Sequence, residues 1–126
     1  MPYLLDTVTI VRHFTDTGYI GIKAREILND FDNHFLISVI SLMEIMYLSE
    51  KHRININLTE TLNKIESSSL YSGIDLTPEI LKVAERTPFG ELHDRLILST
   101  AKWLEIPIIS SDEGFDEVEG IEVIWN

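Results

Sequence analysis

The sequence predicts an α/β domain of three layers, in which a central, mostly parallel sheet of four to five strands lies between helices. Two observations predict this class. Short apolar runs rich in β-branched residues alternate with longer segments of helical periodicity, the order that β-α-β units give. The run at residues 106–109, interrupted only by Pro107, has the composition of a strand buried on both faces. At 126 residues, the chain is expected to form one domain, residues 1–126, with a complete core.

The first half of the chain predicts two strands and three helices. The strands are residues 3–5 and 34–38. The helices are residues 8–14, 22–31 and 39–51. Asp and Gly within residues 15–18 end the first helix, because both favour turns. The third helix is indicated by an apolar set at helical spacing, namely Ile40, Met43, Tyr47 and Leu48.

The second half predicts three helices and three strands, the last of which lies at an edge of the sheet. Asn57 and Glu60 form a capping box for a helix that ends before the serines of residues 67–69. Thr77 followed by Pro78 marks the start of the next helix. The remaining elements are strands at residues 70–76, 106–109 and 121–125, and a helix within residues 91–105.

Composition and charge exclude several classes of protein. The chain has no cysteine, so disulfides and thiolate metal sites are excluded. Its start lacks the basic region of a signal peptide, and no apolar run reaches the roughly 18 residues of a membrane span, so we expect a cytoplasmic protein. The net charge of −11 is opposite to the basic footprint of nucleic-acid binders. A nucleic-acid substrate would therefore need bound cations or a local basic rim.

Four acids stand where predicted strands end or predicted helices begin. Asp6 ends the first strand, Asp112 follows the fourth, Asp94 lies in the first turn of a helix and Glu44 lies one turn into another. Each has a plain structural interpretation, such as a capping box of Glu44 with Ser41, because acids are favoured at helix starts regardless of function. Together, however, they fall on one predicted edge of one sheet, the edge where parallel sheets bind ligands.

Carboxylates that converge in this way predict a metal site. Like charges at close range raise one another's pKa, and a hard divalent cation such as Mg²⁺ or Mn²⁺ relieves the repulsion through oxygen ligands. Zinc is less favoured, because cysteine is absent and the four histidines lack a metalloprotease spacing. We interpret His93 as a partly buried side chain at a helix start, because it points away from its neighbour Asp94 on a helix.

Four short motifs carry a resemblance to a known family. They are LDT at residues 5–7, Glu44 in the third predicted helix, LHDRLI at residues 92–97 and ISSD at residues 109–112. With these motifs the chain resembles PIN-domain proteins and, within that family, the VapC-type toxin nucleases of bacteria and archaea. The resemblance covers essentially the whole chain, and its most specific part is residues 91–115.

The resemblance implies a metal-dependent endoribonuclease, the toxin of a type II toxin–antitoxin pair. It implies that Mg²⁺ or Mn²⁺ is held, directly or through water, by the family's acidic site, here Asp6, Glu44, Asp94 and Asp112. Thr7 and Ser110 would support that site. The metal would activate a water for in-line attack on an RNA phosphodiester, which leaves a 5′-phosphate and a 3′-hydroxyl.

The resemblance also implies partners. These are an RNA substrate, a second copy of the chain in a homodimer, and an antitoxin with a basic tail that occupies the acidic groove, with no membrane involved. Arg12 and Arg95 are the favoured substrate contacts, being near Asp6 and Asp94 in sequence, whereas the other basic residues are interpreted as solvated surface. Extra charge beside the site comes from two further acids, Glu113 and Asp116.

Three other classes of protein share part of this pattern. A non-catalytic relative of the same fold would act only by binding a protein partner. A phospho-acceptor receiver domain would need a second acid beside the first strand's Asp and a Lys after a late strand, but Thr7 follows Asp6 and no Lys follows Ser110. A haloacid-dehalogenase-type phosphatase would need an Asp two residues after Asp6, where Val8 stands.

Overall fold

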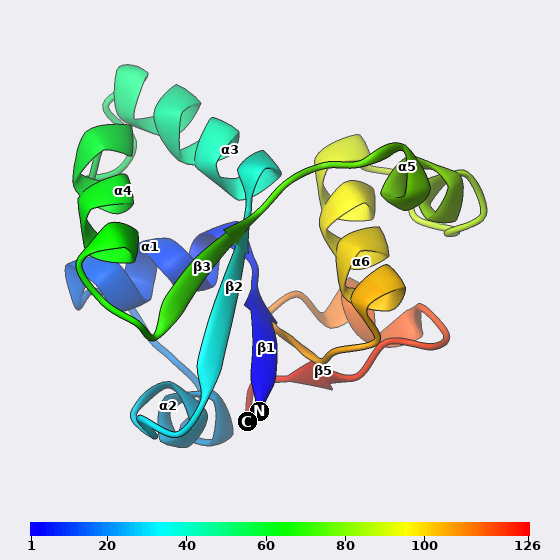
Figure 1. Ribbon diagram of the computed structural model, residues 1–126, viewed down its shortest axis with the longest axis horizontal. Helices are drawn as coiled ribbons and strands as arrows, with labels where there is room; N and C mark the ends of the chain where they lie inside the picture. The colour runs from blue at the N-terminus through cyan, green and yellow to red at the C-terminus, as the bar shows by residue number, and fades with distance from the viewer.

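The protein folds into three layers, with helices on both faces of a five-stranded parallel sheet (Figure 1). The computed structural model describes all residues, 1–126. The strand order is β3-β2-β1-β4-β5. The strands are β1 (Pro2–Leu5), β2 (His34–Ser38), β3 (Tyr71–Ile74), β4 (Ile108–Ile109) and β5 (Val123–Ile124). The helices are α1 (Thr7–Thr15), α2 (Ile22–Leu28), α3 (Val39–Glu50), α4 (Leu58–Glu66), α5 (Pro78–Glu85), α6 (Leu92–Leu104) and a short 3₁₀ helix, η1 (Glu113–Glu117).

Alternate residues of the central strands face two separate hydrophobic cores. Leu5 and Ile109 pack with the side chains of α1 to α4, whereas Leu4 and Ile108 pack with those of α5, α6 and η1. This alternation arises because successive side chains of a strand point to opposite faces. Figure 1 shows the two sets of helices on either side of the sheet, so β1 and β4 are buried on both faces, as the composition of residues 106–109 predicted for β4.

Three helices begin at the edge of the sheet where the strands end. Asp6 joins β1 to α1 and Ser38 joins β2 to α3, and each caps its helix through a side-chain oxygen. Helix α6 leads back to the start of β4, so its first turn lies at this same carboxyl edge (Figure 1). Ligands of parallel sheets bind at this edge, so the fold predicts that the functional site lies there.

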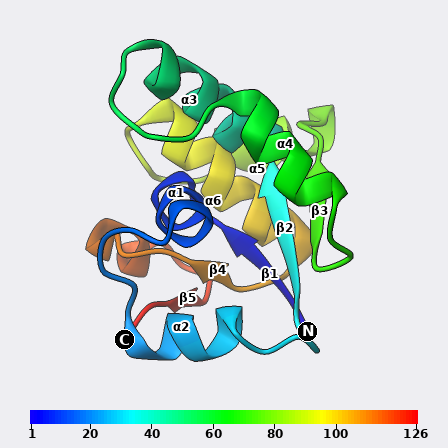
Figure 2. The same cartoon turned by 90° about the vertical axis from the view of Figure 1, so that its left-hand side faces the viewer.

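The chain after β5 docks on the start of α2. Figure 2 shows the C-terminus beside one end of α2 and β5 lying above that helix. The Ala24 backbone N–H donates a hydrogen bond to the carbonyl oxygen of Trp125 at 3.0 Å. A Cβ at Gly21, the residue that precedes α2, would lie only 2.2 Å from the same oxygen. Glycine is therefore required at this position, and α2 fixes the backbone of Trp125.

The predicted order of strands and helices is confirmed, but helix α2 was predicted too long. It ends at Leu28, and both Ile22 and Phe31 are exposed, although the apolar pattern that predicts the helix includes them. Of the apolar residues in this segment, Leu28 packs in the core and Ile27 against it. None of the helices combines the length and the apolar character that a membrane span needs.

The apolar set that indicated α3 is buried only in part. The helix buries Ile40, Ser41 and Ile45, whereas Met43 and Tyr47 lie on the surface. Ser41 faces inward because its hydroxyl lies 3.0 Å from that of Thr7, at the start of α1. The buried face of α3 therefore includes a polar contact with α1, which the apolar periodicity alone did not reveal.

Candidate active site

Asp6 is the buried centre of the candidate site. Its side chain is 7% exposed and lies at the junction of β1 and α1. The backbone N–H of Thr9 donates to its Oδ1 at 2.9 Å, and the Ser110 hydroxyl donates to its Oδ2 at 2.5 Å. Burial raises the pKa of Asp6 above its ordinary value, the hydrogen bonds from Ser110 and Thr9 oppose that rise, and the charge of Asp112 adds to it. Asp6 therefore caps α1 and also joins it to the segment after β4.

Ser110 connects two of the predicted site acids. It is buried, and its hydroxyl donates to Asp6 while accepting the backbone N–H of Asp112 at 3.1 Å. Asp112 is exposed and caps η1, because its Oδ1 accepts the backbone N–H of Gly114 at 2.9 Å. The Ser110 hydroxyl thus holds the carboxyl ends of β1 and β4 in one arrangement.

Thr7 orients the third acid. Its hydroxyl donates to Glu44 Oε1 at 2.6 Å, which ties the first turn of α1 to the second turn of α3. The capping box proposed for Ser41 and Glu44 is wrong, because Ser38 caps α3 and Ser41 is buried inside the helix. Glu44 is instead positioned from outside its own helix, by Thr7.

Asp94 is the acid whose pKa reflects the other acids of the site. It lies in the first turn of α6 and is half-buried. Burial and the negative charges around it raise the pKa of its carboxyl to about 6. After burial, the causes are the charges of Glu91, Glu44, Asp112 and Asp6. All the predicted acids therefore lie within electrostatic range of Asp94, although they come from four separate segments of the chain.

The donor set suits a hard divalent cation, although no three His, Asp or Glu side chains are already drawn together as a metal cluster. The acids raise the pKa of Asp94 without forming a metal cluster, because charge repulsion acts over longer distances than a metal–ligand bond. Every candidate ligand is a carboxylate oxygen, as Mg²⁺ and Mn²⁺ prefer. Hydrogen bonds engage Oε1 of Glu44 and Oδ1 of Asp112, which leaves the second oxygen of each for a ligand.

Glu91 is a member of the site that the sequence interpretation missed. It caps α6, and its Oε2 accepts the backbone N–H of Asp94 at 2.7 Å. That hydrogen bond lowers the pKa of Glu91, so its charge persists and raises the pKa of Asp94. The available signal was its position three residues before Asp94, the spacing of a helix cap.

Arg12, Arg95 and His93 differ in the hydrogen bonds that their side chains make. Arg12 donates from Nη1 to the Tyr19 carbonyl oxygen at 2.9 Å, which ties it to the turn after α1. Arg95 follows Asp94 in α6, and its Nε is buried without a hydrogen-bond partner. The one salt bridge of the structure joins His93 Nδ1 to Glu91 Oε1 at 3.0 Å, in keeping with the helix-start interpretation of His93.

The raised pKa of Asp94 predicts that metal-free protein loses stability as pH rises. A carboxyl whose pKa is about 6 in the folded state and 3.8 when unfolded binds a proton more tightly in the folded state. The contribution of Asp94 to the free energy of unfolding is complete below pH 3.8 and is lost as pH rises through 6. Because half of the side chain meets water, we expect a loss on the order of 1 kcal/mol rather than the full linkage. Urea unfolding in EDTA from pH 4 to 7.5 measures it, and Asp94→Asn should lack this component.

The architecture and the site define a class of protein, α/β proteins whose parallel sheet carries acids from separate segments at its carboxyl edge. The chain belongs to the PIN domain family, which matches residues 3–121. This confirms the family resemblance and the fold class that the sequence predicted.

Three solved structures illustrate the similarity in fold. VapBC2 from Rickettsia felis bound to a DNA fragment from their promoter is 18% identical over 100% of both chains, with a TM-score of 0.75. DNA-bound VapBC from Salmonella typhimurium is 21% identical over 98% of this chain and 97% of the other, with a TM-score of 0.71. FitAcB from Neisseria gonorrhoeae is 15% identical over 97% and 96%, with a TM-score of 0.64. Comparison with curated proteins finds no match.

Proposed function

We propose that this protein is a metal-dependent endoribonuclease and the toxin of a toxin–antitoxin pair. The observation that carries the proposal is the placement of acids from separate segments at one edge of the sheet, where burial and then the charges of the other acids raise the pKa of Asp94. Acids gathered in this way are unfavourable for stability, and a pocket for a cation is a physical reason to retain them. Membership of the PIN domain family supports the same chemistry.

Four residues would hold the cation, namely Asp6, Glu44, Asp94 and Asp112. A divalent Mg²⁺ or Mn²⁺ supplies a lowered pKa for water and compensation for the charge that develops on the phosphate oxygens. Ser110 holds the Asp6 carboxylate in place, and Thr7 does the same for Glu44. Such partners fix the orientation of ligands before they are used.

Arg95 is the better of the two proposed contacts with RNA. Its Nε is buried without a hydrogen-bond partner within the protein, and Arg95 lies in the first turn of α6 at the carboxyl edge of the sheet, where a phosphate could pair with its guanidinium. Arg12 is engaged by the Tyr19 carbonyl, so any contact with RNA would use its remaining donors. The charge of −11 leaves substrate binding dependent on these few cations and on the metal.

We further propose an antitoxin partner and a homodimer, both acting in the cytoplasm. Support for the antitoxin comes from solved structures of similar fold, among them two VapBC structures and a toxin–antitoxin complex from Klebsiella pneumoniae. The acidic site is complementary in charge to a basic antitoxin tail. Such a tail would compensate the same carboxylates that otherwise hold the metal.

The second candidate is a protein of the same fold that acts only by binding a partner. The absence of a ready-made cluster of three ligands is the observation that favours it. The two candidates differ in one property, which is turnover of RNA in the presence of a divalent cation.

The test is cleavage of a mixed-sequence, single-stranded RNA by the purified chain after dialysis against EDTA. We expect no cleavage until MnCl₂ or MgCl₂ is added, and then internal cuts whose downstream fragments carry a 5′-phosphate. An equal length of single-stranded DNA is the matched control. Cleavage that persists in EDTA would contradict the proposal, and a folded chain that stays inactive in both metals would favour the binding protein.

A further inference from the structure

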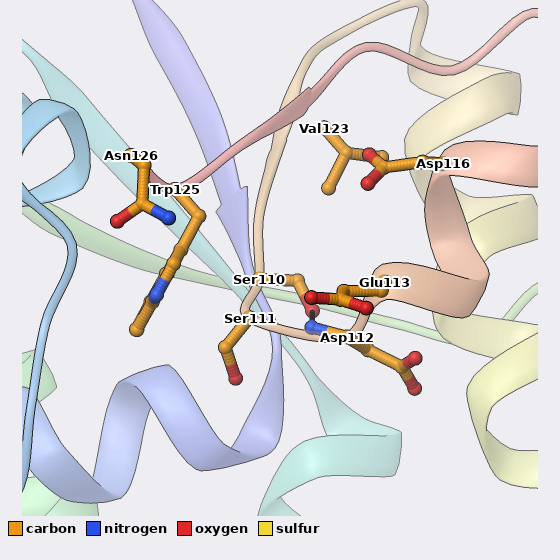
Figure 3. A pocket seen from close by; sticks show the side chains of 8 residues that line it. All are labelled: Ser110, Ser111, Asp112, Glu113, Asp116, Val123, Trp125 and Asn126. Atoms are coloured by element: carbon orange, nitrogen blue, oxygen red, sulfur yellow. Dashed lines mark hydrogen bonds between the residues drawn. The ribbon is translucent and has the colours of Figure 1, made fainter.

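A cavity of about 410 Å³ opens beside the candidate active site (Figure 3). This volume lies within the roughly 300–1,000 Å³ typical of ligand sites. One wall is the segment after β4, including Ser110 and Asp112, and another is the end of the chain after β5, including Trp125. Because Ser110 donates to Asp6, the cavity and the acids share a wall. A group in this cavity would lie next to a phosphate held at the acids.

Trp125 is held rigidly at the cavity. Its carbonyl oxygen accepts the Ala24 N–H, and Gly21 packs directly against its backbone and its ring edge. The Tyr19 ring meets the indole edge to face, with centroids 6.3 Å apart and planes at 71°. Tyr19 in turn donates from its hydroxyl to Asn126 Oδ1 at 3.1 Å, which fastens the residue after Trp125. Little conformational freedom remains to be lost when a flat ligand stacks on the half-buried indole.

We propose that this cavity binds a nucleobase of the RNA, stacked on Trp125, next to the phosphate that is cleaved. The inference rests on the proposed nuclease function and deepens it. Aromatic side chains beside a backbone-binding groove are the usual platform for unpaired bases. Figure 3 shows the Trp125 ring to one side of the Ser110–Ser111 turn and the Glu113 carboxylate to the other.

The charged groups of the cavity select the kind of base. Glu113 and Asp116 line it beyond Asp112, and a carboxylate accepts hydrogen bonds but donates none. Guanine presents two adjacent donors, N1–H and N2–H₂, which match one carboxylate in bidentate fashion. Uracil presents one donor between two carbonyl oxygens, which carboxylates repel. The cavity therefore prefers guanine and disfavours uracil.

The cleavage test compares Trp125→Leu with the matched variant Trp103→Leu. Trp103 is half-exposed near the far end of α6, nine residues after Asp94 and so roughly 13 Å along the helix. We expect Trp125→Leu to raise KM for single-stranded RNA about tenfold with little change in kcat, the size expected when a stacking ring is lost. Trp125→Phe should recover most of the loss, and Trp103→Leu should keep the wild-type KM. A wild-type KM in Trp125→Leu would overturn the base site while leaving the nuclease proposal standing.

A binding test keeps the inference separate from catalysis. In Trp103→Phe, Trp125 is the only tryptophan, so its fluorescence reports the cavity directly. With Ca²⁺ in place of Mg²⁺, the heptanucleotide UUUGUUU should quench it and bind about tenfold tighter than UUUUUUU, since one well-matched pair of hydrogen bonds discriminates by this order. Quenching by the guanine-containing RNA in a chain that cleaves nothing would support the base site and refute the nuclease. No quenching, or equal quenching by both RNAs, would overturn the inference, even where Trp125→Leu fails to fold.

Discussion

Asp94→Asn is expected to reduce Mn²⁺-dependent RNA cleavage by more than about 100-fold while the chain remains folded, because an amide cannot replace a charged metal ligand. The same substitution removes one member of a group of like charges, since Glu91, Glu44, Asp112 and Asp6 all raise the pKa of Asp94. Metal-free Asp94→Asn should therefore be slightly more stable than wild type at pH 7.5. Loss of activity with a gain of stability distinguishes a functional acid from a structural one.

The matched control for that variant is Asp32→Asn. Asp32 is exposed and precedes β2, so it lies at the edge of the sheet opposite to the acids and undergoes the same change of charge. Initial rates of cleavage at saturating Mn²⁺, together with urea midpoints in EDTA, should separate the two variants. Equal rates in wild type and Asp94→Asn would remove Asp94 from the mechanism. A matching test in cells is growth arrest, which wild type should cause and Asp94→Asn should not.

Local signals predicted the fold because strands and helices meet at sharp junctions here. Thr77 and Asn57 cap helices whose starts were predicted correctly, and Asp6, which follows β1, caps α1, whereas α3 is capped by Ser38 and not by Ser41. Such caps depend on neighbouring residues only, so the sequence reveals them directly. Once the strands are known to be parallel, their carboxyl ends must share one edge, and the proximity of the acids follows.

The orientation of side chains across the site could not be predicted in the same way. The buried face of α3 includes Ser41, whose hydroxyl contacts that of Thr7, 34 residues earlier in the chain. The place of Trp125 depends on a glycine, Gly21, that lets α2 approach its carbonyl. Contacts between residues far apart in sequence decide both, and no local pattern encodes them. Glu91 was missed for a different reason, since a cap is expected at its position whether or not a site lies nearby.

Ser110→Ala is expected to lower cleavage at fixed Mn²⁺ by about 10- to 100-fold, the usual cost of losing a residue that orients a metal ligand. The Ser110 hydroxyl donates to Asp6 and accepts from the Asp112 backbone, so its removal frees two acids at once. The Asp6 carboxylate, already raised in pKa by burial, also loses a hydrogen bond that lowers its pKa. Both effects weaken the affinity for the cation, and activity should therefore recover in part as the Mn²⁺ concentration is increased.

Ser99→Ala is the matched control, because Ser99 is also fully buried and its hydroxyl donates to the Arg95 carbonyl oxygen at 2.7 Å, away from any carboxylate. It should cost a similar stability, about 1 kcal/mol, and leave the Mn²⁺ dependence unchanged. Ser110→Thr keeps the hydroxyl and should retain most of the activity. If Ser110→Ala and Ser99→Ala lose activity equally and neither responds to added Mn²⁺, then Ser110 acts only through the stability of the fold. A Mn²⁺ response confined to Ser110→Ala would instead mean that the hydroxyl positions Asp6 and Asp112 for the cation.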